Sequence, residues 1–237
     1  ELRHAKVNHG GSHVILEDFT RKELTYRSLL LKTQILGKAL LQETNDESYI
    51  GVLLPNTSTC AVTVLALHAY RKVPAMINYT AGASAMAASC VTSNIKVLIT
   101  SRQFIAKAEL TDELKAMRKH LKQVIFLEDI AKQISILDKI SGALRYLTLD
   151  RFYRKNPQFV PHIDAPAVIL FTSGSEGTPK GVVLSHRNIT ANKIQSLALM
   201  DLNPLDSMFN ALPMFHAFGF TLGTLTPIMC GIKTFLY

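Results

Sequence analysis

The stretch "PAVILFTSGSEGTPKGVVLSHRN", residues 166–188, places an apolar run directly before a cluster of small hydroxyl residues and glycines. The run "AVIL" (167–170) predicts a buried strand, and "GVVLS" (181–185) predicts a second strand. Residues 172–180, named here the hydroxyl-glycine loop, are expected to connect the two strands, and a helix is expected to begin near Asn188. A strand, a loop, a strand and a helix in this order indicate an α/β layout.

The hydroxyl-glycine loop carries groups that bind phosphate oxygens. Gly174 and Gly177 let the backbone approach a ligand, and the hydroxyl side chains and backbone N–H groups are hydrogen-bond donors. Lys180 adds a positive charge, and Pro179 stiffens its approach. Two common phosphate patterns, GxxxxGK followed by Ser or Thr and GxGxxG, do not fit the loop. Composition alone leaves two interpretations open, a phosphate-binding loop and a plain turn between strands.

Upstream of this stretch, short apolar runs alternate with helical patterns. A short strand pair is expected near residues 13–25, and further strands at 49–55, 73–79, 96–100 and 124–128. Helices are expected from Thr25, from Asn56 or Thr57, and over residues 82–94 and 111–123. Alternation of this kind favours right-handed crossovers and parallel strands. The sequence therefore predicts an α/β fold with layered mixed or parallel sheets and flanking helices.

Residues 130–153 depart from this alternation. Apolar residues recur there every three or four positions, with Lys132, Lys139 and Arg145 among them. The pattern predicts a surface helix that packs its apolar face on the core, and a basic amphipathic segment resting on a membrane or a partner is the alternative. Three prolines in residues 156–166 place an internal boundary there. The chain is thus expected to divide into residues 1–160 and residues 161–237.

The composition of the chain limits the classes of partner that can be expected. The net charge of +8 suggests an anionic partner such as a nucleotide, a carrier protein or a phospholipid surface. Nucleic acid is not expected, because no run combines dense Lys and Arg with regular aromatic residues. Cys60, Cys90 and Cys230 lie far apart, so we expect reduced thiols and no metal site. The apolar runs are too short to cross a bilayer, and the first residue is Glu1, so a soluble piece of a longer protein is expected.

The residue order in the hydroxyl-glycine loop resembles the signature loop of the adenylate-forming superfamily. That superfamily includes acyl-CoA synthetases, luciferases and the adenylation domains of peptide synthetases. Ile169 and every position from Thr172 to Lys180 satisfy its pattern. The segments "ELTYRSLL", "GVLLPNTSTCAVTVLALHAYRKVPAMINY" and "ALPMFHAFGF" are similar to other family segments, so the resemblance covers essentially the whole chain.

The resemblance implies a two-step reaction. A carboxylate attacks the α-phosphate of ATP, and a thiol then takes the acyl group from the adenylate. ATP and Mg²⁺ are the implied cofactors, with the Mg²⁺ ligands mostly outside this chain, and Lys180 and His216 are the implied catalytic residues. The residues implied to hold ATP are Thr172, Ser173, Gly174, Ser175, Glu176, Gly177, Thr178 and Lys180. Those implied to line the start of the acyl pocket are Phe215, His216, Phe218 and Gly219. Without the resemblance, a histidine in an apolar stretch, such as His216, is more often a core residue. His186 is interpreted as a structural residue.

Within the superfamily, Glu176 and the segment "FLEDIAKQISILDKI" resemble one bacterial subgroup. Its members join a 2-acylglycerophosphoethanolamine acyltransferase to an acyl-[acyl-carrier-protein] synthetase. This implies a fatty acid and acyl-carrier protein as partners, phospholipid remodelling, and a place at the cytoplasmic side of the bacterial inner membrane. A long-chain fatty-acid–CoA ligase is the nearest alternative, and a non-catalytic membrane-surface or interaction module is an alternative of another class.

Several segments of the family pattern have no counterpart here. No "YGxTE"-like segment, no "TGD" segment, no hinge and no C-terminal lysine region occur in the sequence. The chain is therefore expected to end inside the large N-terminal domain and not to complete adenylation alone.

Overall fold

The computed structural model describes residues 1–44, 47–157, 160, 162–172 and 179–237, without the side chain of Asp150. Its strands are β1 (Val14–Asp18), β2 (Leu24–Thr25), β3 (Tyr49–Leu53), β4 (Val73–Met76), β5 (Val97–Thr100), β6 (Gln123–Phe126), β7 (Pro166–Thr172), β8 (Lys180–Ser185), β9 (Ser207–Asn210) and β10 (Lys233–Leu236). Its helices are α1 (Leu2–His9), α2 (Tyr26–Thr44), α3 (Ser58–Ala69), α4 (Ala83–Thr92), α5 (Arg102–Lys107), α6 (Thr111–Arg118), α7 (Leu127–Gln133), α8 (Ile136–Leu147), α9 (Leu149–Lys155), α10 (His186–Leu199), α11 (Ala217–Phe220), the π-helical turn η2 (Thr221–Leu225) and α12 (Thr226–Cys230).

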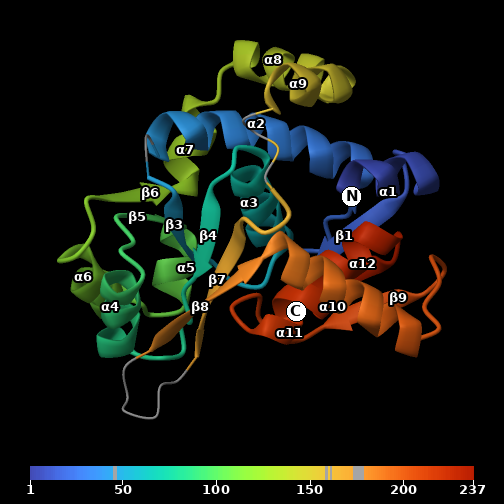
Figure 1. The fold of residues 1–237 in the computed structure, drawn as a ribbon. Coiled ribbons are helices and arrows are strands. Elements are labelled where there is room, and N and C mark those ends of the chain that lie inside the picture. Colours follow the sequence, from blue (N-terminus) through green and yellow to red (C-terminus); the bar gives the residue numbers. More distant parts are fainter. Residues whose placement is uncertain (45–46, 158–159, 161, 173–178) are drawn as a thin grey trace.

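Two sheets organise the described residues (Figure 1). The larger has the strand order β6-β5-β3-β4-β7-β8, with all neighbours parallel except the antiparallel β7–β8 pair. The smaller has the order β2-β1-β10-β9, in which β1 pairs in parallel with β10. Helix α3 contacts both β4 and β1, so it lies between the two sheets. The predicted α/β fold with mixed sheets and flanking helices is confirmed.

The core follows from continuous apolar runs. Strands β4 and β5 are buried at every residue, as expected of strands that have helices on both faces of a sheet. Helix α3 begins after Thr57, whose side chain accepts a hydrogen bond from the Cys60 backbone N–H, which confirms the predicted cap. Helix α10 begins at His186 rather than near Asn188, because Ser185 and Asn188 form a capping box.

Helix α6 is shorter than predicted. It ends at Arg118, whereas the sequence pattern extended the helix to residue 123. The backbone N–H groups of Lys122 and Gln123 both donate to the carbonyl of Lys96, which leads directly into the β5–β6 pairing. Gln123 therefore joins the sheet and Lys122 leads into it, although their sequence pattern is also compatible with a basic helix.

The predicted boundary near residue 160 falls between α9 and β7. The six-stranded sheet continues across it, because Ile169 in β7 pairs with Ala75 in β4. The division of the chain into two parts at this point stays a prediction. No helix within the described ranges combines the length and the apolar character that crossing a membrane requires.

Residues 127–155 form three helices rather than one, and α8 faces the protein with its polar side. Lys38 in α2 donates to Asp138 across 2.9 Å, and the Arg145 guanidinium donates to the Tyr70 hydroxyl. A Cβ at Gly142 would lie 2.3 Å from Ile35 Cγ1, so α8 and α2 approach closely at this glycine. The apolar stripe faces outward instead, with exposed fractions of 52–76% at Ile136, Leu137, Ile140, Leu144 and Leu147. The expectation that the stripe packs on the core is wrong for Leu137, Ile140, Leu144 and Leu147, whereas Ile134, which precedes α8, does pack against the core.

His68 makes stability depend on pH. Its Nε2 lies 2.7 Å from the carbonyl oxygen of Ala167 in β7, and burial, with a smaller effect of His186, lowers its pKa from 6.5 to about 4. Since the folded state binds fewer protons than the unfolded state between these values, stability falls as the pH drops through this window. We expect the free energy of unfolding to be about 2 kcal/mol lower at pH 5 than at pH 7.5 from this group.

Urea unfolding at both pH values measures this loss. The His68→Gln variant keeps a hydrogen-bond donor for Ala167 and lacks the titrating ring, so its unfolding free energy should change less between pH 7.5 and pH 5. Equal pH dependence in the two proteins would remove His68 as the cause.

Candidate functional site

The two ends of the hydroxyl-glycine loop lie side by side. Strands β7 and β8 form an antiparallel hairpin in which Thr172 pairs with Lys180. Both of these residues are exposed, whereas Pro179 is buried. The predicted ATP-binding residues Ser173, Gly174, Ser175, Glu176, Gly177 and Thr178 lie outside the described residues. The strand, loop and strand order is therefore confirmed at its ends.

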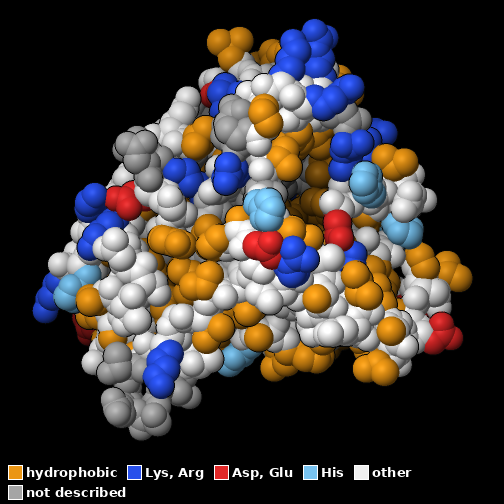
Figure 2. Space-filling view, in the orientation of Figure 1, with side chains coloured by type: hydrophobic (Ala, Val, Ile, Leu, Met, Phe, Trp, Pro, Cys, Tyr) orange, Lys and Arg blue, Asp and Glu red, His pale blue; other side chains and the backbone are white. Residues whose placement is uncertain are grey.

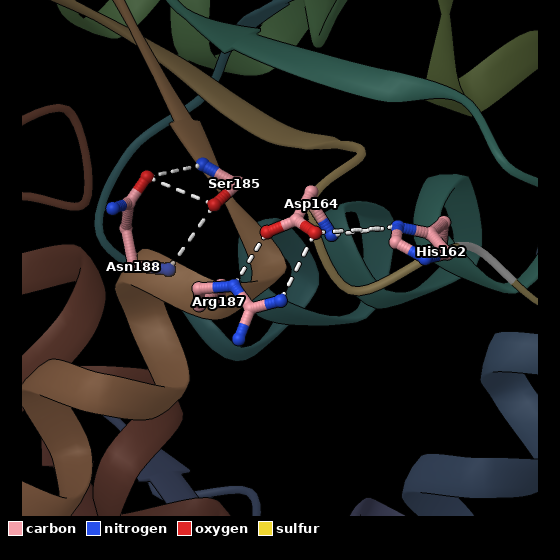
Figure 3. A network of polar contacts seen from close by, with 5 residues as sticks. All are labelled: His162, Asp164, Ser185, Arg187 and Asn188. Carbon is pink, nitrogen blue, oxygen red and sulfur yellow. Dashed lines mark hydrogen bonds and ion pairs between the residues drawn. The ribbon is translucent and has the colours of Figure 1, made fainter.

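The base of this hairpin is fixed by a polar network (Figure 3). Asp164 accepts two hydrogen bonds from Arg187, one from Nε and one from Nη2, which is the strong bidentate arrangement. The Arg187 backbone N–H also donates to the carbonyl of Ile163. Ser185 and Asn188 cap the start of α10 beside it. The network ties the start of β7 to the end of β8, at the end of the hairpin opposite Thr172 and Lys180.

Parallel strands β3, β4, β5 and β7 end at one border of the six-stranded sheet, named here the carboxyl edge. Thr172 ends β7 there, and Tyr79 follows β4 there. In open α/β sheets, ligands bind outside the carboxyl ends of the strands. Thr172 and Lys180, the described ends of the hydroxyl-glycine loop, therefore lie where the architecture favours a ligand.

The segment "ALPMFHAFGF", residues 211–220, reaches the same edge and is named here the histidine segment. The ring of buried Phe215 contacts Tyr79 edge to face with centroids 4.8 Å apart, and His216 lies against Phe215 at 4.5 Å. His216 and Phe218 are exposed, and Gly219 is buried. The backbone N–H of His216 donates to the carbonyl of Pro213. The exposed rings of His216 and Phe218, the first of which lies against buried Phe215, give this segment a surface that can receive a ligand.

Gly219 is required by a close approach of the backbone. A Cβ at this position would lie 2.3 Å from the carbonyl oxygen of Leu212 and 2.4 Å from that of Pro213. Real Cβ atoms do not come this close to backbone atoms. The role of Gly219 is therefore to let the histidine segment fold back on itself, which positions the rings on either side of it.

Asn210 holds the histidine segment in place, and its role is not visible in the sequence pattern. Its buried amide nitrogen donates to the Gly219 carbonyl and to the Thr224 hydroxyl, both at 3.1 Å. Its amide oxygen accepts from the Leu212 backbone N–H, and its carbonyl accepts from Asn56 at the carboxyl edge. A buried amide with all these partners stabilises one loop conformation. Its position directly before the histidine segment is the one sequence signal that points to it.

The two predicted catalytic residues are not joined by a direct contact. No hydrogen bond, ion pair or ring contact links Lys180 to His216 within the part of the chain that the structure describes. Among the same residues, no group of three His, Cys, Asp or Glu side chains could hold a metal ion. His186 packs edge to face on His68 with centroids 5.6 Å apart, behind the β7–β8 hairpin. The roles of Lys180 and His216 stay predictions.

A family model described as "AMP-binding enzyme" matches residues 2–237. The medium-chain fatty-acid–CoA ligase of Escherichia coli (strain K12) is 36% identical over 109 residues, which are 44% of this chain and 19% of that protein. Long-chain-fatty-acid–CoA ligase 1 of Cavia porcellus is 26% identical over 208 residues, 82% of this chain and 30% of that protein.

The fold is also that of a solved enzyme, the o-succinylbenzoate CoA synthetase (MenE) from Bacillus subtilis. Its complex with the acyl-adenylate intermediate OSB-AMP matches with a TM-score of 0.77 and 17% identity, covering 100% of this chain and 55% of that one. Its complex with ATP and magnesium ion matches with a TM-score of 0.75 and 18% identity, covering 100% and 56%. The chain therefore spans about half of the solved enzyme and 19–30% of the two curated relatives.

Proposed function

The chain belongs to the AMP-binding enzyme family, and from this we propose that the protein containing it activates a fatty acid with ATP and passes the acyl group to a thiol. The observation that carries the proposal is the shared position of two segments. Thr172 and Lys180, the ends of the hydroxyl-glycine loop, and the histidine segment all lie at the carboxyl edge of one sheet. A phosphate-binding loop beside an apolar surface suits a reaction between ATP and a fatty carboxylate.

We assign the residues in that reaction as follows. Thr172 and the loop that follows it hold the β- and γ-phosphates of ATP, and Lys180 balances their negative charge. His216 lies beside the substrate carboxylate, with Phe215, Phe218 and Gly219 forming the start of the acyl pocket. Phosphoryl chemistry of this kind depends mainly on positioning and charge neutralisation. Magnesium would supply further neutralisation of the phosphate charge when bound, and the described residues offer no cluster of three acidic, His or Cys side chains to hold it.

The thiol acceptor has two candidates. The curated relatives reported above are named as CoA ligases, which supports coenzyme A. Glu176 and the segment "FLEDIAKQISILDKI" support acyl-carrier protein instead, by the subgroup resemblance. The same resemblance is the basis on which we propose a fusion to an acyltransferase, a link to phospholipid remodelling and a location at the inner membrane. We place coenzyme A first, since the relatives match larger parts of the chain than these short features do.

Pyrophosphate exchange tests the activation step. With the full-length protein, ATP and palmitate, labelled pyrophosphate should enter ATP, and omission of palmitate should stop the exchange. Thioester formation is then measured with coenzyme A and with acyl-carrier protein in parallel. Exchange that does not depend on a carboxylic acid would overturn the proposal, and the parallel acceptors decide between the two thiols.

The outward stripe of α8 supports a second activity, attachment to an anionic membrane surface. Five large apolar side chains face outward on this helix, and Lys139, Arg151 and Lys155 are exposed on α8 and α9. Figure 2 shows hydrophobic and basic side chains next to one another over these two helices, at the top of the view. An apolar stripe with basic neighbours is typical of helices that lie in the membrane interface.

Co-sedimentation with vesicles containing phosphatidylglycerol tests this surface. We expect the Lys139→Glu, Arg151→Glu, Lys155→Glu variant to bind about tenfold or more weakly, because each basic residue near an anionic surface contributes about 1 kcal/mol. Arg145 is left unchanged, since its guanidinium contacts Tyr70 and Phe152. The matched control is Lys119→Glu, an exposed lysine beyond α6. A Leu137→Ser, Leu144→Ser variant should also lose binding to the vesicles. Unchanged binding in both variants would exclude α8 as the membrane-binding surface.

A further inference from the structure

A cavity of about 610 Å³ lies between helices α2, α3 and α5 and the segment that follows β1. Its walls are largely apolar, formed by Leu24, Leu36, Leu54, Val62, Phe104 and Ile134. The volume falls within the range of about 300–1,000 Å³ in which proteins hold small-molecule ligands. The cavity is therefore large enough for a ligand with a long apolar part.

The charged groups around this cavity are mainly cationic. Lys22, Lys32 and Lys107 line it, and all three side chains are exposed. None of the three makes a hydrogen bond or ion pair within the described ranges. They come from three separate elements, namely the β1–β2 connection, α2 and α5. Three unpaired ammonium groups around an apolar interior suit a ligand that is apolar along its length and anionic at one end.

Asp18 is the one acidic residue among those lining the cavity, and it is already satisfied. Its carboxylate accepts from the backbone N–H and the hydroxyl of Thr20, and from the backbone N–H of Ser58 at the start of α3. With 5% of its surface exposed, Asp18 is turned away from the solvent. Its negative charge offsets one of the three positive charges, so the groups that line the cavity keep a net positive charge.

Aromatic rings separate this cavity from the histidine segment. Phe104 lines the cavity and contacts Tyr79 with ring centroids 5.2 Å apart. Tyr79 in turn contacts Phe215, next to His216. Tyr79 and Phe215 do not line the cavity. The cavity and the proposed acyl pocket are thus two separate places, divided by rings in edge-to-face contact.

We propose that this cavity is a second lipid site, which binds a long-chain anionic amphiphile with its chain among Leu36, Val62 and Phe104 and its anionic group at the lysines. The site is separate from the proposed adenylation site and does not depend on its activity. Its ligand class, a long-chain carboxylate, is also the class proposed as substrate. Binding there can therefore report on the supply of that class without taking part in the reaction.

Calorimetric titration with monomeric palmitate, in the absence of ATP, tests the site in the full-length protein. We expect two sites per chain in the wild type. The Lys22→Glu, Lys32→Glu, Lys107→Glu variant should lose one of them, with at least tenfold weaker binding, and the Lys119→Glu control should keep both. Val62→Phe, which fills the cavity, should lose the same site, and hexadecanol, which lacks the charge, should bind at least tenfold more weakly than palmitate.

The outcomes separate this proposal from the catalytic one. Two intact palmitate sites in the lysine variant would overturn it. So would a result in which Phe218→Asp loses a site while neither the lysine variant nor Val62→Phe is left with a single site. None of the three lysines belongs to the proposed reaction, so palmitate-dependent pyrophosphate exchange should persist in the lysine variant. Absent exchange in the wild type together with lysine-dependent binding would refute the catalytic proposal and leave the second site standing.

Discussion

Alanine in place of Gly219 is expected to lower the free energy of unfolding by about 3 kcal/mol. The added methyl group would meet the carbonyl oxygens of Leu212 and Pro213 at 2.3 and 2.4 Å. These atoms belong to the backbone of the same short loop, so neither can move away without breaking the hydrogen bonds that Asn210 makes to Gly219 and Leu212. The cost is larger than for most substitutions of glycine by alanine because no flexible side chain can yield.

Chemical unfolding followed by circular dichroism measures this loss. Gly11→Ala is the matched control, since its Cβ would meet Lys6 Cε at 3.6 Å, an ordinary contact. The control should change the free energy of unfolding by less than about 1 kcal/mol. Because Gly219 lies between Phe218 and Phe220, the Gly219 variant should also lose palmitate-dependent exchange. A Gly219 variant as stable as the control would show that the histidine segment relaxes freely.

Replacing Lys180 with alanine is expected to slow palmitate-dependent pyrophosphate exchange by about 100-fold or more, with no loss of stability. Lys180 is exposed at the first position of β8, opposite Thr172, and its side chain makes no hydrogen bond or ion pair to the described residues. Its removal therefore leaves the fold unchanged. The ammonium group is expected to act on the phosphates of ATP, where charge develops in the transition state.

Two variants control this result. Lys180→Arg keeps the charge and should retain more exchange than Lys180→Ala. Lys155→Ala removes an exposed lysine from α9 and should leave exchange unchanged. Full exchange by a Lys180→Ala protein that unfolds at the wild-type urea concentration would remove Lys180 from the reaction.

Much of the larger sheet can be predicted from the sequence, because β3, β4, β5 and β7 are continuous apolar runs between helical patterns. Strands that are buried on both faces of a sheet are apolar at nearly every position, and such runs can be recognised in the sequence. The hairpin between Thr172 and Lys180 follows from the spacing of two of these runs. The smaller sheet is different, since β9 and β10 are only four residues long and neither is buried throughout. A strand of that length carries too little pattern to be recognised without its partners.

Sequence periodicity also does not predict which side of α8 faces the protein. The 3.6-residue period identifies an apolar stripe, and burial on the core is the usual consequence. Here, the contacts of Lys38 with Asp138 and of Ile35 with Gly142 turn the polar side inward. Both contacts join residues about a hundred positions apart, so neither can be seen in a local window. The amide of Asn210 has nearer partners, in Leu212, Gly219 and Thr224, but their meeting depends on how the histidine segment folds back rather than on a periodic pattern.

The pairing of β1 with β10 sets an order for folding during synthesis. Leu16 lies opposite Thr234, so β1 has no β10 to pair with until synthesis has passed residue 234. At roughly 5–20 residues per second, that wait is on the order of ten seconds. Until then, the apolar residues of β1, Ile15 and Leu16, have no β10 to cover them, although both are fully buried in the folded chain. Strand β1 thus leaves the ribosome long before β10 and is among the last parts of the smaller sheet to be protected from aggregation.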